Sequence, residues 1–167
     1  MKKRRYDLLI FDWNGTLSTA TRVPLNHYKE GLSVPALFPG VKSVLKALHE
    51  QGYMMAVASV ASKAKLQFET SHHEIDCYFS LLAGGDGPYS KPDPALLLDI
   101  ASSLGVGPEQ ALMIGDTVSD MEMALKARID RVSVCYGLGN KEELEDFKPI
   151  CFINSINELL EWLNYKS

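Results

Sequence analysis

Cysteine is scarce in this chain, and the few cysteines form no recognisable framework. There are three among 167 residues, at Cys77, Cys135 and Cys151, and no two of them make a CxxC pair. An odd number at wide spacing excludes a disulfide-stapled fold and offers no zinc motif. The pattern indicates reduced thiols, as in a cytoplasmic protein.

Long apolar runs and an excess of positive charge are also missing. No stretch approaches the roughly 20 apolar residues that a transmembrane helix needs. The basic residues 2–5 precede an apolar run, as in a secretion signal, but Asp7 and Asp12 bracket that run and leave it too short. The net charge of −4 argues against nucleic acid as a partner. We therefore expect a cytoplasmic protein that binds neither a membrane nor nucleic acid.

What remains is the composition of one globular domain, spanning residues 1–167. Hydrophobic residues make up 46% and charged residues 23%, which are ordinary values. Apolar strand-like segments alternate with helical ones, which predicts an α/β fold: a Rossmann-like, doubly wound, mostly parallel sheet with helices on both faces. The expected strands are 6–11, 53–58, 78–83, 111–114, 131–135 and 150–153, and the expected helices lie near 40–51, 62–71, 93–104, 118–127, 141–146 and 155–164.

The most informative motif is an apolar strand that runs into an aspartate. Leu8-Leu9-Ile10-Phe11 is followed by Asp12, and Gly15-Thr16 then makes a tight turn. This order places a carboxylate at the carboxyl end of a buried strand, beside backbone N–H groups that can hold an anion. Such a carboxylate can attack phosphorus and can ligate Mg²⁺.

Three further motifs follow in order, each just past a strand or at a helix start. They are Ser59 after an apolar segment, Lys91 before Pro92-Asp93-Pro94, and the run from Gly115-Asp116 to Ser119-Asp120. In a parallel sheet these positions converge on one edge. Taken singly, Ser59 could be a loop hydroxyl, Asp116 a helix cap, and Asp120 a first-turn carboxylate favoured by the helix dipole. Together they supply what a phosphoryl group and its Mg²⁺ require.

With these motifs the sequence resembles the haloacid dehalogenase-like hydrolase superfamily, and within it the phosphoglycolate-phosphatase-like members. The resemblance extends from Leu8 to about Gly139. It implies an Mg²⁺-dependent phosphomonoester hydrolase in which Asp12 forms an aspartyl-phosphate. The implied metal ligands are Asp12, the backbone carbonyl of Asn14, and Asp116, while Asp120 orients Lys91 or a metal-bound water. The groups implied to hold the phosphoryl are Asp12, Gly15, Thr16, Ser59, Ala61 and Lys91.

One position departs from the pattern of the phosphatases. Two residues after the nucleophile these enzymes usually carry a second Asp, the general acid and base, and here that residue is Asn14. An amide cannot exchange a proton at neutral pH. Three outcomes stay open: a slow phosphatase that favours good leaving groups such as aryl phosphates, a protein that passes the phosphoryl on, or a phosphate-binding protein without useful turnover. His27 or a water is a candidate for the missing acid.

The stretch between Asp12 and Ser59 leaves little room for a cap domain. Its second half is the expected helix 40–51, so only residues 18–37 remain, and this predicts a capless or minimal-cap member. An open site suits a large substrate such as a phosphoprotein, unless a neighbouring subunit in a homo-oligomer supplies the lid. Residues 19–37 are either a substrate contact or a solvated loop or short helix. The candidate contact residues in this segment are Arg22, His27, Tyr28 and Lys29.

Three other classes of protein share some of these residues. A phospho-acceptor signalling domain also combines an Asp, a hydroxyl and a Lys, but its acceptor usually follows a middle strand, whereas Asp12 ends the first. A non-catalytic phosphate-binding protein is favoured only by Asn14. A dehalogenase also lacks the second Asp, but it normally needs a cap to desolvate the carbon–halogen bond.

Overall fold

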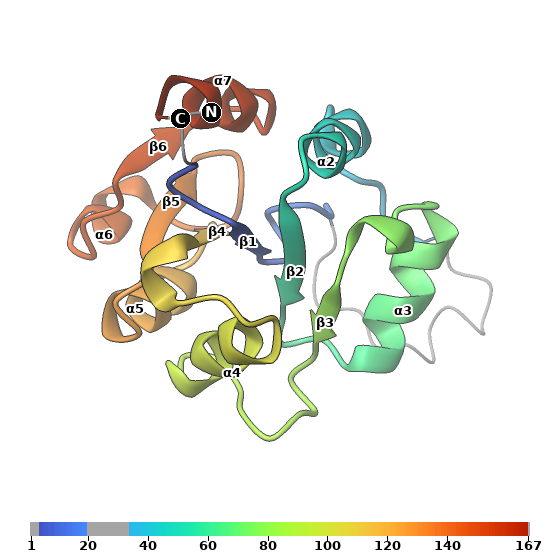
Figure 1. The fold of residues 1–167 in the computed structure, drawn as a ribbon, viewed down its shortest axis with the longest axis horizontal. Coiled ribbons are helices and arrows are strands. Elements are labelled where there is room, and N and C mark those ends of the chain that lie inside the picture. The colour runs from blue at the N-terminus through green and yellow to red at the C-terminus, as the bar shows by residue number, and fades with distance from the viewer. Residues whose placement is uncertain (1–3, 20–33, 167) are drawn as a thin grey trace.

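The computed structural model describes residues 4–19 and 34–166, and its centre is one parallel sheet of six strands (Figure 1). The strand order is β3-β2-β1-β4-β5-β6, and every adjacent pair is parallel. The strands are β1 (Leu8–Phe11), β2 (Met54–Ala58), β3 (Leu81–Ala83), β4 (Ala111–Gly115), β5 (Asp130–Val134) and β6 (Cys151–Ile153). The predicted doubly wound α/β fold is confirmed.

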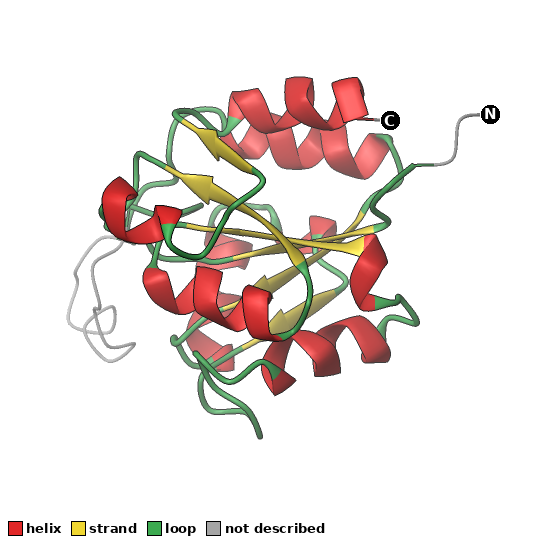
Figure 2. Cartoon of the chain, turned by 90° about the vertical axis from the view of Figure 1, so that its left-hand side faces the viewer, coloured by secondary structure: helices red, strands yellow, loops and turns green. Residues whose placement is uncertain are grey.

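Helices cover both faces of the sheet, which explains why the strands are continuous apolar runs. Side chains alternate along β1, so Leu9 and Phe11 join one core and Leu8 and Ile10 the other. The first core includes residues of α2, α3 and α7, and the second includes residues of α4 and α5. Figure 2 shows helices on both sides of the sheet. The helices are α2 (Val41–Glu50), α3 (Lys63–His72), α4 (Ala95–Ser103), α5 (Val118–Lys126), α6 (Lys141–Glu145) and α7 (Asn157–Lys166).

Several elements begin one to three residues later than predicted, and for β3 and α4 the local reason is clear. The strand predicted at 78–83 starts only at Leu81, because a 3₁₀ turn occupies Asp76–Tyr78. The helix predicted at 93–104 starts at Ala95, whose N–H donates to the Asp93 carboxylate at 2.9 Å. Asp93 therefore satisfies a helix-terminal donor from outside the helix.

The point where the chain reverses its direction across the sheet lies between β1 and β4. From β1 the chain builds β2 and β3 on one side, then returns to place β4 against the other side of β1. Clefts at the carboxyl ends of the strands form at such switch points. Asp12 follows β1 and Asp116 follows β4, so both lie at this place.

The segment that could carry a cap leaves and rejoins the domain at one point. Ser18 and Leu37 form an antiparallel bridge, and the Thr19 N–H donates to the Ala36 carbonyl at 2.8 Å. The residues predicted to contact substrate from this segment lie outside the described part of the chain: Arg22, His27, Tyr28 and Lys29. No helix among the described residues has the length and apolar character needed to span a bilayer.

Candidate active site

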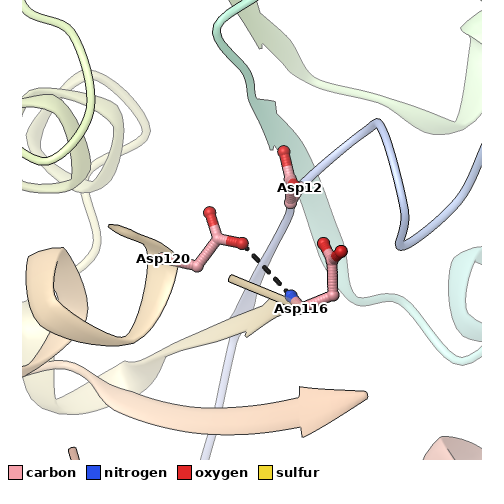
Figure 3. A group of neighbouring side chains, drawn as sticks. All are labelled: Asp12, Asp116 and Asp120. Atoms are coloured by element: carbon pink, nitrogen blue, oxygen red, sulfur yellow. Dashed lines mark hydrogen bonds between the residues drawn. The ribbon is translucent and has the colours of Figure 1, made fainter. Parts of the chain in front are cut away.

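Three buried carboxylates meet at the switch point (Figure 3). Asp12 and Asp116 extend the ends of β1 and β4, and Asp120 comes from the first turn of α5. Oxygen atoms of all three lie within 4.8 Å of one another. Carboxylate oxygens at this spacing are a donor set for a hard divalent cation such as Mg²⁺.

The turn after Asp12 is organised by one carbonyl group. The Trp13 carbonyl accepts the backbone N–H groups of Thr16, Leu17 and Ser18, at 3.3, 3.0 and 2.9 Å. Gly15 has a φ of 86°, and a Cβ there would overlap the Asp116 carboxylate. Glycine at this position is therefore required both by the left-handed backbone and by the close approach to Asp116.

Asp116 is held in place by two donors and does not cap a helix. Its Oδ1 accepts the Thr16 hydroxyl at 2.9 Å, and its Oδ2 accepts the Leu138 N–H at 2.8 Å. The N-cap of α5 is Thr117, which forms a capping box with Asp120. The helix-cap interpretation of Asp116 is therefore wrong, because the neighbouring threonine already performs that role.

Lys91 joins two of the carboxylates. Its Nζ lies 2.7 Å from Asp12 Oδ1 and 2.5 Å from Asp120 Oδ1, and its side chain is only 4% exposed. Burial would lower the pKa of Lys91, but the charges of Asp12 and Asp120 outweigh burial and raise this pKa above its usual range. The ammonium therefore stays protonated, and its charge opposes the rise that burial causes in the pKa of Asp12.

Replacing Lys91 by methionine is expected to lower the free energy of unfolding by about 3 kcal/mol, because it leaves Asp12 and Asp120 buried without their cation. The control is Lys126→Met, which breaks an exposed ion pair with Glu122 at 2.6 Å and should cost under about 1 kcal/mol. Urea unfolding with EDTA present measures both. Equal effects would show that the Lys91 contacts add nothing beyond a surface pair.

The carboxylates would accept a cation readily. Burial raises the pKa of Asp12 well above its ordinary value, and the charge of Asp120 adds to this effect against the opposing charge of Lys91. Burial also raises the pKa of Asp116. Removing a carboxylate from water disfavours its charged form, and a divalent cation between Asp12 and Asp116 would offset that cost. The oxygen donors present therefore fit Mg²⁺.

The remaining predicted phosphoryl contacts cluster around two turns. Ser59 follows β2 and is 1% exposed, and its Oγ accepts the Ala61 N–H at 3.1 Å. The Gly15 N–H donates to the Ser18 carbonyl at 2.8 Å, and the Thr16 N–H donates to Trp13. Since these two N–H groups already bond within the turn, contact between them and a phosphoryl stays a prediction that requires those bonds to open.

Asn14 occupies the position where a general acid is usual. Its side-chain Oδ1 is buried and accepts no hydrogen bond from the part of the chain that the structure describes. Asn14 also lines the cavity beside Asp12. An unsatisfied polar atom at a cavity wall needs a partner from outside the protein, such as a water or a ligand.

The cavity beside Asp12 is lined in part by residues that the sequence analysis did not identify. It measures about 140 Å³, and its lining comprises Asp12, Asn14, Val60, Lys91, Thr117, Ser119 and Leu138. Val60 lies between Ser59 and Ala61, the two predicted phosphoryl contacts of the second motif, and was itself not predicted. A larger cavity of about 280 Å³ lies beside β3 and α4, but its lining contains none of the three site carboxylates.

The contact between Leu138 and Asp116 could have been predicted only from the two glycines that flank Leu138 in the sequence, Gly137 and Gly139. Added Cβ atoms at Gly137 and Gly139 would overlap Asp116. Only glycine lets this loop approach closely enough for the Leu138 N–H to reach the Asp116 carboxylate.

The sequence profile for proteins described as haloacid dehalogenase-like hydrolase matches residues 9–134, which is most of the chain. The chain belongs to this family. The match contains all four motifs and confirms the resemblance that they indicated.

Relatives in this family include proteins named phosphoglycolate phosphatase. One from Nitrosococcus oceani is 38% identical over 130 residues, which cover 77% of this chain and 57% of that protein. One from Salmonella paratyphi A is 34% identical over 125 residues, covering 74% of this chain and 50% of that protein. The chain therefore spans about half the length of the curated relatives it matches.

Solved structures with the same fold cover nearly the whole chain. A predicted phosphoglycolate phosphatase from Haemophilus somnus has a TM-score of 0.84 at 22% identity, covering 94% of this chain and 97% of that one. A predicted phosphatase from Clostridium acetobutylicum has a TM-score of 0.80 at 20% identity, covering 96% and 99%. At these identities the likeness concerns the fold.

Proposed function

We propose that this chain is an Mg²⁺-dependent phosphomonoester hydrolase that acts through an aspartyl-phosphate on Asp12. The observation that carries the proposal is the buried Lys91 ammonium, which bridges Asp12 and Asp120 beside Asp116 at the switch point of the sheet. Its family relatives named phosphoglycolate phosphatase support the same reaction class.

In the proposed reaction a carboxylate oxygen of Asp12 attacks the substrate phosphorus. A bond forms between that oxygen and phosphorus as the bond to the leaving group breaks, and the leaving group takes the electron pair. Water then attacks the phosphorus of the aspartyl-phosphate, and the bond between phosphorus and the Asp12 oxygen breaks. The carboxylate is restored, inorganic phosphate leaves, and the proton that the water loses passes to solvent, because the Asn14 amide cannot accept it. Lys91 stabilises the charge that spreads over the phosphoryl oxygens, and Ser59 donates a hydrogen bond to one of them.

A bound Mg²⁺ would supply further positive charge at the phosphoryl oxygens. Asp12, the backbone carbonyl of Asn14 and Asp116 would hold it. Asp120 would contribute less directly, because its Oδ1 accepts Lys91 and its Oδ2 accepts three donors from Asp116 and Thr117.

Asn14 shapes the range of substrates in this proposal. The amide can donate a hydrogen bond but cannot transfer a proton to a departing alkoxide. Esters whose leaving group is stable as an anion, such as aryl phosphates, should react fastest. The second candidate function, phosphate binding or phosphoryl relay without useful turnover, rests on the same residue.

The physiological substrate is proposed by class alone. With the minimal cap that the sequence predicts, the site would suit a phosphoprotein or another large phosphomonoester, or a second copy of the chain in a homo-oligomer would close it. Phosphoglycolate enters as a candidate through the names of the relatives. A cytoplasmic location stays part of the proposal, supported by three free cysteines.

Dependence on Mg²⁺ is the direct test. Phosphate release from phenyl phosphate should require Mg²⁺ and stop in EDTA, and Mg²⁺ at about 100 times its Kd should stabilise the fold by about 2.7 kcal/mol. For a chain of this size that corresponds to a melting shift of roughly 5–10 °C. Asp116→Asn should abolish both effects.

The control variant is Asp99→Asn on α4, where the same chemical change lies outside the carboxylate cluster. It should keep both the activity and the Mg²⁺-dependent shift. Wild-type protein that melts higher with Mg²⁺ and releases no phosphate would move the conclusion to the binding or relay function. Neither effect in the wild type would overturn the proposal.

A further inference from the structure

A second buried polar cluster lies beneath the nucleophile turn, and no step of the proposed reaction uses it. Trp13, the residue after Asp12, is fully buried, and its indole Nε1–H donates to Glu69 Oε2 at 2.5 Å. Glu69 lies in α3 and is itself fully buried. Lys65, one turn earlier and 4% exposed, places its Nζ 3.9 Å from Glu69 Oε1.

Stability alone gives a poor reason for these charges. A buried ion pair loses hydration on both partners, and apolar residues of similar size are often as stabilising or more so. The neighbouring position Leu66 on the same helix is fully buried and apolar. What a carboxylate provides at Glu69 that leucine cannot is a directed acceptor for the Trp13 indole.

Trp13 is the residue through which that acceptor reaches the active site. Its carbonyl receives the N–H groups of Thr16, Leu17 and Ser18, so its placement sets the path of the turn. The turn carries the Asn14 carbonyl and the Thr16 hydroxyl that bonds to Asp116. Glu69 therefore contacts the one side chain whose backbone organises this loop.

The same helix is tied to the second motif. α3 begins directly after its N-cap Ser62, whose side chain accepts the Lys65 N–H. Ser62 lies three positions after Ser59, and Ala61 between them donates to the Ser59 hydroxyl oxygen. α3 thus connects the Trp13 turn, which Glu69 contacts, with the loop that carries Ser59.

We propose that Glu69 is a positioning residue: through the Trp13 indole it fixes the turn from Asp12 to Ser18 relative to α3 and the Ser59 loop. The expected effect of Glu69 on kcat rests on the proposed function. Its structural consequence, the rigidity of that turn, can be measured whether or not the chain turns over a phosphoester.

Three substitutions separate positioning from bulk packing. Trp13→Phe removes the donor and Glu69→Leu removes the acceptor, whereas Glu69→Gln keeps an oxygen that can accept the indole N–H. The matched control is Tyr6→Phe, which deletes a hydroxyl that donates to the Asp130 carboxylate at 2.7 Å at the other end of β1.

Amide hydrogen exchange supplies the readout that does not depend on activity. Peptides covering residues 12–18 should exchange about 10-fold faster in Trp13→Phe and Glu69→Leu, while peptides of β4 stay unchanged. Glu69→Gln should restore most of the protection, and Tyr6→Phe should leave it intact. Unchanged exchange at 12–18 in the first two variants would overturn the proposal whatever the kinetics.

The kinetic arm uses phenyl phosphate with Mg²⁺. Displacement of the turn should lower kcat about 10- to 100-fold in Trp13→Phe and Glu69→Leu with little change in KM, and Glu69→Gln should recover most of it. A fall in melting temperature with kcat unchanged would mean that Glu69 supports packing only. No turnover in the wild type would count against the proposed function, and the exchange experiment would still decide the role of Glu69.

Discussion

Asp12→Asn is expected to lower kcat for phenyl phosphate by about 10⁴-fold or more, equivalent to about 5 kcal/mol of barrier. An amide at this position can still accept the Lys91 hydrogen bond but cannot form the acyl phosphate that the proposed route requires. The measurement is steady-state phosphate release in saturating Mg²⁺. The loss should therefore appear in kcat, with the fold unchanged by circular dichroism.

The control for this substitution is Asp7→Asn, at the other end of β1. Asp7 precedes β1 and accepts the Gln110 side chain at 2.7 Å, so Asp7→Asn makes the same chemical change at the opposite end of the strand. It should leave kcat unchanged. A wild-type intermediate that is trapped from labelled substrate and released by hydroxylamine would identify the acyl phosphate. Activity retained in Asp12→Asn would place the nucleophile elsewhere.

Asn14→Asp is expected to raise kcat for an alkyl ester such as benzyl phosphate by about 10²- to 10⁴-fold, the usual contribution of a general acid. The change is nearly isosteric and falls on a side chain that already lines the cavity, with an unsatisfied oxygen among the described residues. The gain on 4-nitrophenyl phosphate should be much smaller, because nitrophenolate departs without a proton. The ratio of the two gains is the quantity to measure.

A second asparagine provides the comparison for this gain. Asn164 is exposed on α7, and Asn164→Asp should change neither rate. Equal gains on both esters would indicate a general electrostatic effect in place of proton transfer. No gain on benzyl phosphate would mean that another group already serves as the acid or that leaving-group departure is not limiting.

The sheet could be predicted because its physical signal is local. β1 and β4 are buried on both faces, so each appears in the sequence as an unbroken apolar run. The site residues followed because they directly succeed those runs, as Asp12 and Asp116 do. The start of β3 could not be predicted, since the 3₁₀ turn ends on the aromatic Tyr78 and is followed by Phe79, and these side chains look like the beginning of the strand.

Contacts between distant segments left no such signal. Trp13 and Glu69 are separated by 56 positions, and nothing in the pattern of α3 distinguishes a buried glutamate from a surface one. The hydrogen bond from the Leu138 N–H to Asp116 could not be predicted either, because almost every residue type has a backbone N–H. The glycine neighbours of Leu138, Gly137 and Gly139, were the only trace of that close approach.

The bridge between Ser18 and Leu37 gives this domain a natural site for added sequence. Paired backbone groups hold the two ends of the segment between Ser18 and Leu37 together. The length of this segment can therefore change with little effect on the geometry of the sheet. Each doubling of a flexible loop costs only about 0.6 kcal/mol of closure entropy. New modules that choose a substrate could therefore be acquired or exchanged at this junction while the catalytic edge of the sheet keeps its geometry.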